Sequence, residues 1–181
     1  MFHYGKHGKR AVKMVRIREA SPADLGKIRE IYNYYIRNST ATFRENEYSQ
    51  KEILEKFEAV RRIYPFLVAV DETEGIAGFA YISRFRDPSA YRLAETTIYL
   101  SPHCLHRGLG KMLYEELIRM AREKRPDLTG LVACITLENK ASIGFHEKMG
   151  FLPSGTLPKA GFKFQRFCDV GFWHYLYPDL Q

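Results

Sequence analysis

Hydrophobic positions along the chain follow two periods, and the switches between them predict the order of the elements. Residues 14–18 alternate apolar and basic side chains, which predicts a short strand. Apolar positions then recur at helical spacing over 25–36, behind a Ser-Pro-Ala-Asp turn at 21–24 that is typical of a helix start. A second helix over 50–60 begins at a Ser-Gln-Lys-Glu sequence with capping-box spacing.

The middle of the chain changes to strand-like patterns. Residues 66–70 are all apolar, and a Glu-Thr-Glu-Gly turn at 72–75 separates them from an apolar return over 76–83, which predicts a hairpin. Residues 91–100 predict a fourth strand and 108–124 a third helix with one apolar face. The remaining predicted elements are a strand at 131–137, a short helix at 139–148, and strands at 151–155 and 168–176. The order β-α-α-β-β-β-α-β-α-β-β predicts a mixed α/β (α+β) fold in one domain.

Composition supports one globular domain. The 181 residues are 45% hydrophobic and 14% aromatic, which is enough for a core, and no apolar run is long enough to cross a membrane. The three cysteines are Cys104, Cys134 and Cys168, which form no C-x-x-C pair. We therefore expect no disulfide framework, no metal site and a reducing, cytoplasmic location. Cys134 lies in an apolar run and is predicted to be a core residue.

Charge is concentrated at the start of the chain. The net charge is +7, and residues 1–13 supply four basic residues and no acid, which leaves about +3 for the rest. We interpret 1–13 as a basic, flexible extension and 14–181 as the domain. A basic protein attracts nucleic acid or a polyanionic small molecule, and the small residual charge favours the second. No dense basic cluster interleaved with aromatics occurs outside 1–13, so neither a nucleic-acid nor a membrane partner is expected.

The first segment with candidate chemistry is His-Arg-Gly-Leu-Gly-Lys at 106–111, between a strand and a helix. Glycine lets a ligand approach the backbone closely, and a helix N-terminus offers unpaired N–H groups to an anion. Arg107 and Lys111 add positive charge. The spacing matches neither G-x-G-x-x-G nor the P-loop. The alternative is an ordinary strand-to-helix turn.

Two segments carry a resemblance to a known family. The R-G-L-G sequence at 107–110 resembles the pyrophosphate loop of GNAT acetyltransferases, Q/R-x-x-G-x-G/A. The sequence NKASIGFHEKMGF at 139–151 is similar to that family's N-x-x-A-x-x-x-Y-x-x-x-G-F segment, with Ser142 in place of the Ala and His146 in place of the Tyr. The replacement at His146 is shared with the phosphinothricin N-acetyltransferase-like branch.

Further short sequences are similar to that branch: Ala-Tyr-Arg at 90–92, Glu-Thr-Thr-Ile-Tyr at 95–99, Gly-Phe-Lys at 161–163 and Asp-Val-Gly-Phe-Trp at 169–173. The resemblance covers 14–177. It implies a mostly antiparallel central sheet that splays between its fourth and fifth strands, with about four flanking helices. It also implies a homodimer, and direct transfer of an acetyl group from acetyl-CoA to the amine of a small amino-acid-like substrate such as phosphinothricin or methionine sulfoximine.

The resemblance assigns two catalytic candidates. Glu95 falls where the branch has its acid/base glutamate, and in a strand its side chain shares one face with Thr97 and Tyr99. Burial would raise the pKa of Glu95 toward that of a useful base. The alternative is an ion pair with Arg86 or Arg92. His146 is the candidate that protonates the leaving thiolate or relays a proton, and its alternative is a histidine that packs against coenzyme A.

The resemblance also implies binding residues. Those expected at the coenzyme are Ile98, Tyr99, Leu100, His106, Arg107, Gly108, Leu109, Gly110, Lys111 and Asn139. Those expected at the substrate are Phe85, Arg86, Tyr91 and Arg92, with Phe43 as a weaker candidate. Asn139 could instead be a helix cap, and 84–92 a solvated loop. Two other functions remain open, namely a GNAT enzyme for another amine (a protein N-terminus, a lysine or an aminoglycoside) and a coenzyme A-binding protein without turnover.

Overall fold

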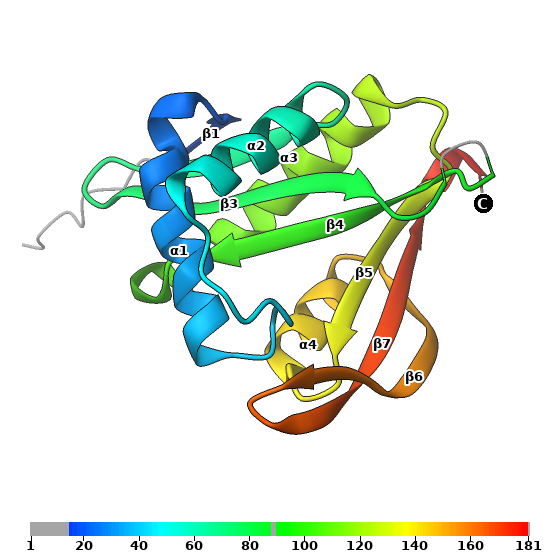
Figure 1. Cartoon of the computed structure of the whole chain (residues 1–181). Helices are drawn as coiled ribbons and strands as arrows, with labels where there is room; N and C mark the ends of the chain where they lie inside the picture. The colour runs from blue at the N-terminus through cyan, green and yellow to red at the C-terminus, as the bar shows by residue number, and fades with distance from the viewer. Residues whose placement is uncertain (1–14, 88–89, 181) are drawn as a thin grey trace, which may run out of the picture.

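The computed structural model describes residues 15–87 and 90–180, so the basic segment 1–13 lies outside the described residues. The strands are β1 (Val15–Glu19), β2 (Phe66–Asp71), β3 (Gly75–Arg84), β4 (Leu93–Leu100), β5 (Gly130–Thr136), β6 (Leu152–Lys163) and β7 (Arg166–Leu176). The α-helices are α1 (Leu25–Asn38), α2 (Gln50–Arg61), α3 (Leu109–Lys124) and α4 (Lys140–Lys148). This order confirms the predicted sequence of elements and the mixed α/β fold (Figure 1).

One sheet contains the seven described strands in the order β1-β2-β3-β4-β5-β7-β6. All neighbours are antiparallel except β4 and β5, which are parallel. β4 pairs with β3 from Ala94 to Leu100, but with β5 only from Leu93 to Glu95. Beyond that point the two strands diverge, as Figure 1 shows, and the predicted splay is confirmed.

Side chains fill the point of divergence. The Thr96 hydroxyl donates a hydrogen bond to the Val132 carbonyl oxygen (3.3 Å) and accepts one from the Tyr114 hydroxyl (2.7 Å). A side-chain bond therefore replaces the next backbone rung between β4 and β5. Because all three residues are buried, these hydrogen bonds are shielded from water and fix where the strands separate.

Helices cover both faces of the sheet. On the face that carries Tyr99, the ring of Tyr32 from α1 packs against Phe79 of β3 and against Tyr99 (centroid distances 5.6 and 4.8 Å). On the opposite face, α3 contributes Leu113, Tyr114 and Leu117, which are fully buried. No helix among the described residues is long and apolar enough to span a bilayer. β4 is therefore packed between α1 on one face and α3 on the other.

The last hairpin is longer than predicted. The expected strand at 151–155 continues as β6 to Lys163, and β7 begins at Arg166 instead of residue 168. Register shifts after Pro153 and after Leu157 let β6 continue past its prolines. The turn is formed by Phe164 and Gln165, both with positive φ (51° and 58°). Such two-residue turns usually carry Asn or Gly, so Phe-Gln gave no turn signal in the sequence.

Candidate active site

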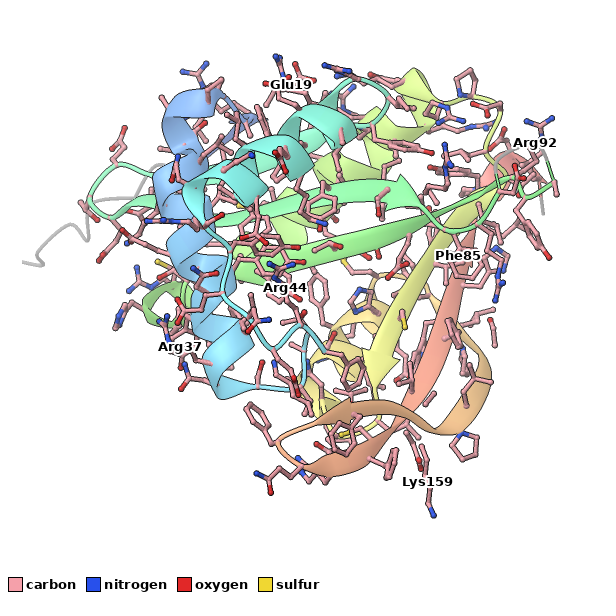
Figure 2. All side chains as sticks on the ribbon, in the orientation of Figure 1. Glu19, Arg37, Arg44, Phe85, Arg92 and Lys159 are labelled. Carbon is pink, nitrogen blue, oxygen red and sulfur yellow. The ribbon has the colours of Figure 1, made fainter. Side chains whose placement is uncertain are left out.

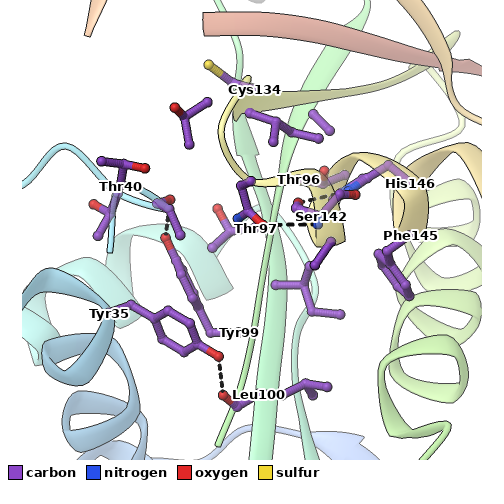
Figure 3. Close-up of a pocket in the computed structure, with 18 of the residues that line it drawn as sticks. Tyr35, Thr40, Thr96, Thr97, Tyr99, Leu100, Cys134, Ser142, Phe145 and His146 are labelled. Carbon is purple, nitrogen blue, oxygen red and sulfur yellow. Dashed lines mark hydrogen bonds between the residues drawn. The ribbon is translucent and has the colours of Figure 1, made fainter. Parts of the chain in front are cut away.

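A cavity of about 480 Å³ opens where β4 and β5 diverge. Its floor is formed by residues 95–100 of β4 and 133–136 of β5, and its sides by the loop at 40–43 and the first turns of α4. Figure 3 shows Tyr35 and Tyr99 approaching it from one side and Phe145 and His146 from the other. Among the described residues, no group of three His, Cys, Asp or Glu side chains is arranged to hold a metal ion.

Glu95 lies in the cavity at the last rung between β4 and β5. Its side chain is half-buried, and this burial raises the pKa of the carboxyl above 4.5, partly offset by attraction to Lys56 of α2. The alternative ion pair is not formed within the described residues: Arg92 lies 3.8 Å from Asp127, and the Arg86 guanidinium lies over the rings of Phe85 and Tyr91. The carboxylate therefore faces the cavity with the raised pKa of a general base.

Cys134 is not a core residue, contrary to the prediction from its apolar neighbours. Its side chain is exposed and lines the cavity, because β5 has lost β4 as its neighbour at this level. Burial against the cavity floor and the nearby charge of Glu95 raise the pKa of the thiol to about 11. Cys104 and Cys168 are buried free thiols.

The end of β4 presents backbone groups to the cavity. Ile98, Tyr99 and Leu100 all line it, and the edge of β4 that faces β5 has no strand partner here among the described residues. The Tyr35 hydroxyl donates to the Leu100 carbonyl oxygen (2.8 Å), and the Tyr99 hydroxyl donates to the Ala41 carbonyl oxygen (2.9 Å). An extended ligand could occupy this free edge as a further strand would.

The segment 106–111 forms the start of α3. Gly108 precedes the helix in the left-handed region (φ 77°), where glycine is favoured. Gly110 lines the cavity, and a Cβ there would already contact Leu100 and Phe145 at 3.4 Å. The first N–H groups of α3 have no partner within the helix, which is the arrangement that binds anions.

The other residues predicted around this turn differ in how far their side chains are exposed. His106, Arg107 and Lys111 are exposed, and Leu109 is buried. Arg107 donates to the His103 carbonyl oxygen (2.8 Å), so its guanidinium remains beside the turn. The segment therefore combines a helix N-terminus with exposed positive charge.

Two predicted residues lie on α4. The Asn139 side chain caps the helix by accepting from the Ser142 N–H (3.1 Å), and it also lines the cavity. His146 is buried against the rings of Tyr114 and Phe151, with centroids 5.2 and 5.3 Å away.

The hydrogen bond of His146 fixes its tautomer. Its Nδ1 lies 2.8 Å from the Ser142 carbonyl oxygen, and a carbonyl only accepts, so Nδ1 carries the proton and Nε2 is left with a lone pair. Burial lowers the pKa of His146 below 6.5, against a smaller opposing effect of this hydrogen bond. The imidazole is therefore neutral at neutral pH.

The loop at 40–43 forms one wall of the cavity, and most of it was not predicted from the sequence. Thr40, Ala41 and Thr42 line the cavity together with Phe43, the only one of them predicted. Lys163 Nζ donates to the carbonyl oxygens of Ser39 (2.8 Å) and Thr42 (2.6 Å). These contacts join segments more than 120 residues apart, so no local pattern could have revealed them.

The four predicted substrate residues lie apart from this cavity. Phe85, Arg86, Tyr91 and Arg92 are not among its lining residues. Figure 2 shows Phe85 and Arg92 at the end of the sheet where β4 begins. Phe85 packs edge-on against Phe172 of β7 (6.3 Å). They form a separate cluster at the start of β4.

Comparisons with known proteins agree on one family. Residues 17–171 match the model of the family described as "Acetyltransferase (GNAT) domain". The phosphinothricin N-acetyltransferase of Streptomyces viridochromogenes is 37% identical over 161 residues, covering 88% of this chain and 86% of that protein. An L-methionine sulfoximine/L-methionine sulfone acetyltransferase of Pseudomonas paraeruginosa is 37% identical over 158 residues, covering 86% and 91%.

A solved structure shows the same arrangement. The phosphinothricin acetyltransferase of Sinorhizobium meliloti, crystallised in complex with acetyl-CoA, superposes with a TM-score of 0.81 at 34% identity. The match covers 91% of this chain and 96% of that protein. The fold similarity therefore extends over nearly all of both chains.

Proposed function

This chain belongs to the GNAT family of acetyltransferases, and from that membership we propose that it acetylates the amino group of a small amino-acid-like substrate. It is an acetyl-CoA-dependent N-acetyltransferase, and phosphinothricin and methionine sulfoximine, on which the relatives act, are our first candidates for its acceptor. The observation that carries the proposal is the half-buried Glu95 carboxylate, with a raised pKa, in the cavity at the β4–β5 divergence.

The described residues fit acetyl-CoA as co-substrate. The free edge of β4 at 98–100 suits the extended pantetheine arm, and the N-terminus of α3 suits the pyrophosphate. We assign 106–111 to the pyrophosphate and Asn139 to the arm. We call 106–111 together with 139–146 the coenzyme wall. Acetyl-CoA supplies an activated thioester, and the chain supplies its position and the proton transfers.

Glu95 is our general base. The ammonium group of an amino acid must lose a proton before nitrogen can attack the thioester carbonyl carbon. Glu95 accepts that proton and the C–N bond forms; the nitrogen then loses a second proton to solvent, and the tetrahedral oxyanion collapses to the amide with loss of the coenzyme A thiolate. A backbone N–H at the free edge of β4 is our candidate donor to the oxyanion. No acyl-enzyme forms in this series of steps.

His146 is better suited to packing than to acid catalysis. A general acid needs a proton to give, and the neutral imidazole with Nδ1–H bound to the Ser142 carbonyl has only a lone pair at Nε2. We therefore assign His146 to the coenzyme wall as a hydrogen-bond acceptor. The released thiolate then takes its proton from solvent.

The acceptor lies, in this proposal, on the face of β4 that carries Glu95, Thr97 and Tyr99. That side of the cavity is closed by 40–43 with Tyr32 and Tyr35, which we call the acceptor wall. Phe85, Arg86, Tyr91 and Arg92 remain our candidates for contacts to an outer part of the acceptor. Arg86 or Arg92 would then bind its carboxylate.

The test is thiol release from acetyl-CoA across a panel of amines. The panel contains phosphinothricin, methionine sulfoximine, ordinary amino acids, a polyamine, an aminoglycoside and a lysine peptide. We expect turnover with the amino-acid-like members alone. Turnover confined to the other amines would overturn the proposed acceptor class, and bound coenzyme A without any turnover would favour a binding protein.

Two further properties belong to this proposal. The β6–β7 hairpin exposes apolar side chains at Leu157, Phe162, Phe164 and Phe167, which supports a homodimer with a second copy on the hairpin. Light scattering that gives the mass of a single chain would contradict the homodimer.

The three free cysteines support a reducing location such as the cytoplasm.

A further inference from the structure

The Gly-Phe-Lys sequence at 161–163 has no part in the mechanism above, although its structural setting is unusual. Gly161 and Lys163 lie two residues apart at the end of β6 and are both buried, whereas Phe162 between them is exposed. Alternation along a strand therefore turns Gly161 and Lys163 to one face. That face meets the loop at 39–43.

Lys163 is a buried cation held by backbone oxygens. The residue is only 1% exposed, and its Nζ donates to the carbonyls of Ser39 and Thr42. No carboxylate lies within ion-pair distance in the described part of the chain, and Glu45 provides only a weaker attraction. Burying an ammonium group without a counter-ion is costly, and here the cost is offset by bonds to the two residues that flank the cavity-lining Thr40 and Ala41.

Gly161 contacts the same loop through the ring of Phe43. A Cβ at this position would come within 2.2 Å of the Phe43 ring, so the ring occupies the space that a side chain would need. Phe43 in turn lines the cavity. From β4, the Tyr99 hydroxyl holds the Ala41 carbonyl. Three carbonyls of the loop are therefore held by side chains from distant strands, and its one ring packs against the backbone at Gly161.

We propose that Gly161 and Lys163 form a latch, that is, a pair of positioning residues on the last hairpin that hold the loop at 39–43, which supplies 40–43 to the acceptor wall. This inference rests on the proposed function, because it assigns 40–43 to the acceptor and not to the coenzyme. The loop contacts Tyr99 on the Glu95 face of β4, whereas Gly110 at the start of α3 lies against Leu100, whose side chain points to the other face. The latch thus affects the fit of the amine and leaves the coenzyme site unchanged.

The primary test is Lys163→Met, with Lys159→Met as its matched control. Lys159 is exposed on the same hairpin and points away from the molecule (Figure 2), so its loss removes the same charge without touching the loop. We expect Lys163→Met to raise the KM for the acceptor by about tenfold or more, since two carbonyls lose their donor. The change in kcat and in the acetyl-CoA dissociation constant should stay within about twofold, and Lys159→Met should change nothing.

A second measurement reads the loop directly. Amide hydrogen exchange of a peptide covering 39–43 should be faster in Lys163→Met by about tenfold or more, and unchanged in Lys159→Met. This readout needs no turnover. If the wild-type protein acetylates no amino acid, the proposed function fails, and hydrogen exchange alone decides whether the latch exists. Unchanged exchange in the loop would overturn the latch even if the acceptor class is correct.

Gly161→Ala provides an independent variant. The added methyl group must displace the Phe43 ring, so the KM for the acceptor should rise. Combined with Phe43→Ala, the methyl group has nothing to displace, and the double variant should match Phe43→Ala alone. Additive effects of the two substitutions would show that Gly161 does not act through Phe43 and would remove it from the latch.

Discussion

The coenzyme wall and the acceptor wall face each other across one cavity and are built in different ways. The coenzyme wall consists of two continuous segments whose candidate binding groups are set by local backbone geometry: a left-handed glycine, a helix start and a capped second helix. The acceptor wall is a loop held by side chains from β4 and from the last hairpin. The coenzyme wall is therefore fixed mainly by local backbone, and the acceptor wall depends on side chains that are distant in the sequence.

The largest expected effect is a loss of kcat in Glu95→Gln at unchanged binding of acetyl-CoA. Glu95→Gln removes the proton acceptor on the acceptor side, and we expect kcat to fall by about 10²–10⁴-fold. Calorimetry should show acetyl-CoA bound as in the wild type, because the coenzyme wall is unchanged. Glu72→Gln, at an exposed position in the β2–β3 turn, is the control. Turnover of Glu95→Gln near the wild-type level would remove Glu95 as the base.

The next effect tests the coenzyme wall. Gly108→Ala places a side chain at φ 77°, which costs about 1–2 kcal/mol although no atom of the chain obstructs the Cβ. We expect the α3 turn to relax and the affinity for acetyl-CoA to fall about tenfold. Gly26→Ala in α1 adds the same methyl group in open space without a positive φ. It should preserve affinity and slightly raise stability. Equal affinities of the two variants would place the phosphates elsewhere.

A smaller effect concerns the pKa of Glu95. The base acts deprotonated, so kcat/KM falls as the pH drops through this pKa, and burial places that fall above the usual glutamate range. The charge of Lys56 lowers the pKa in part. Lys56→Met should therefore move the acidic limb of the pH profile to higher pH. Lys51→Met, on the same helix but exposed, should leave the limb in place. A shift to lower pH would contradict the assignment.

The smallest expected effect is that of the basic N-terminal segment. Within 15–87 and 90–180, the residues that line the cavity lie between Tyr32 and His146. We propose that 1–13 is an extension to the domain, and deletion of these residues should change kcat and both KM values by less than about twofold. A large loss of kcat/KM at unchanged melting temperature would indicate that the segment contributes to the site.

The two walls also differ in how far the sequence could predict them. The order of elements and the turn before α3 follow from periodicity, glycine placement and short motifs, which are local signals, whereas the splay at β4 was implied by the family resemblance. The prediction that Cys134 is a core residue was wrong. It rested on the apolar neighbours of Cys134 in the strand, whereas the exposure of its side chain depends on β4 turning away from β5. The contact of Lys163 with the loop at 39–43 depends on register shifts in β6, which no pattern in the sequence reveals.

The exposed thiol of Cys134 has a consequence for the durability of the enzyme. A thiolate beside an acetyl thioester would exchange with it and become acetylated, which would block the cavity. With a pKa of about 11, the thiol at pH 7 is ionised in only about one molecule in ten thousand. Burial of the Cys134 side chain and, as the smaller cause, the negative charge of Glu95, our proposed base, thus keep the neighbouring sulfur protonated.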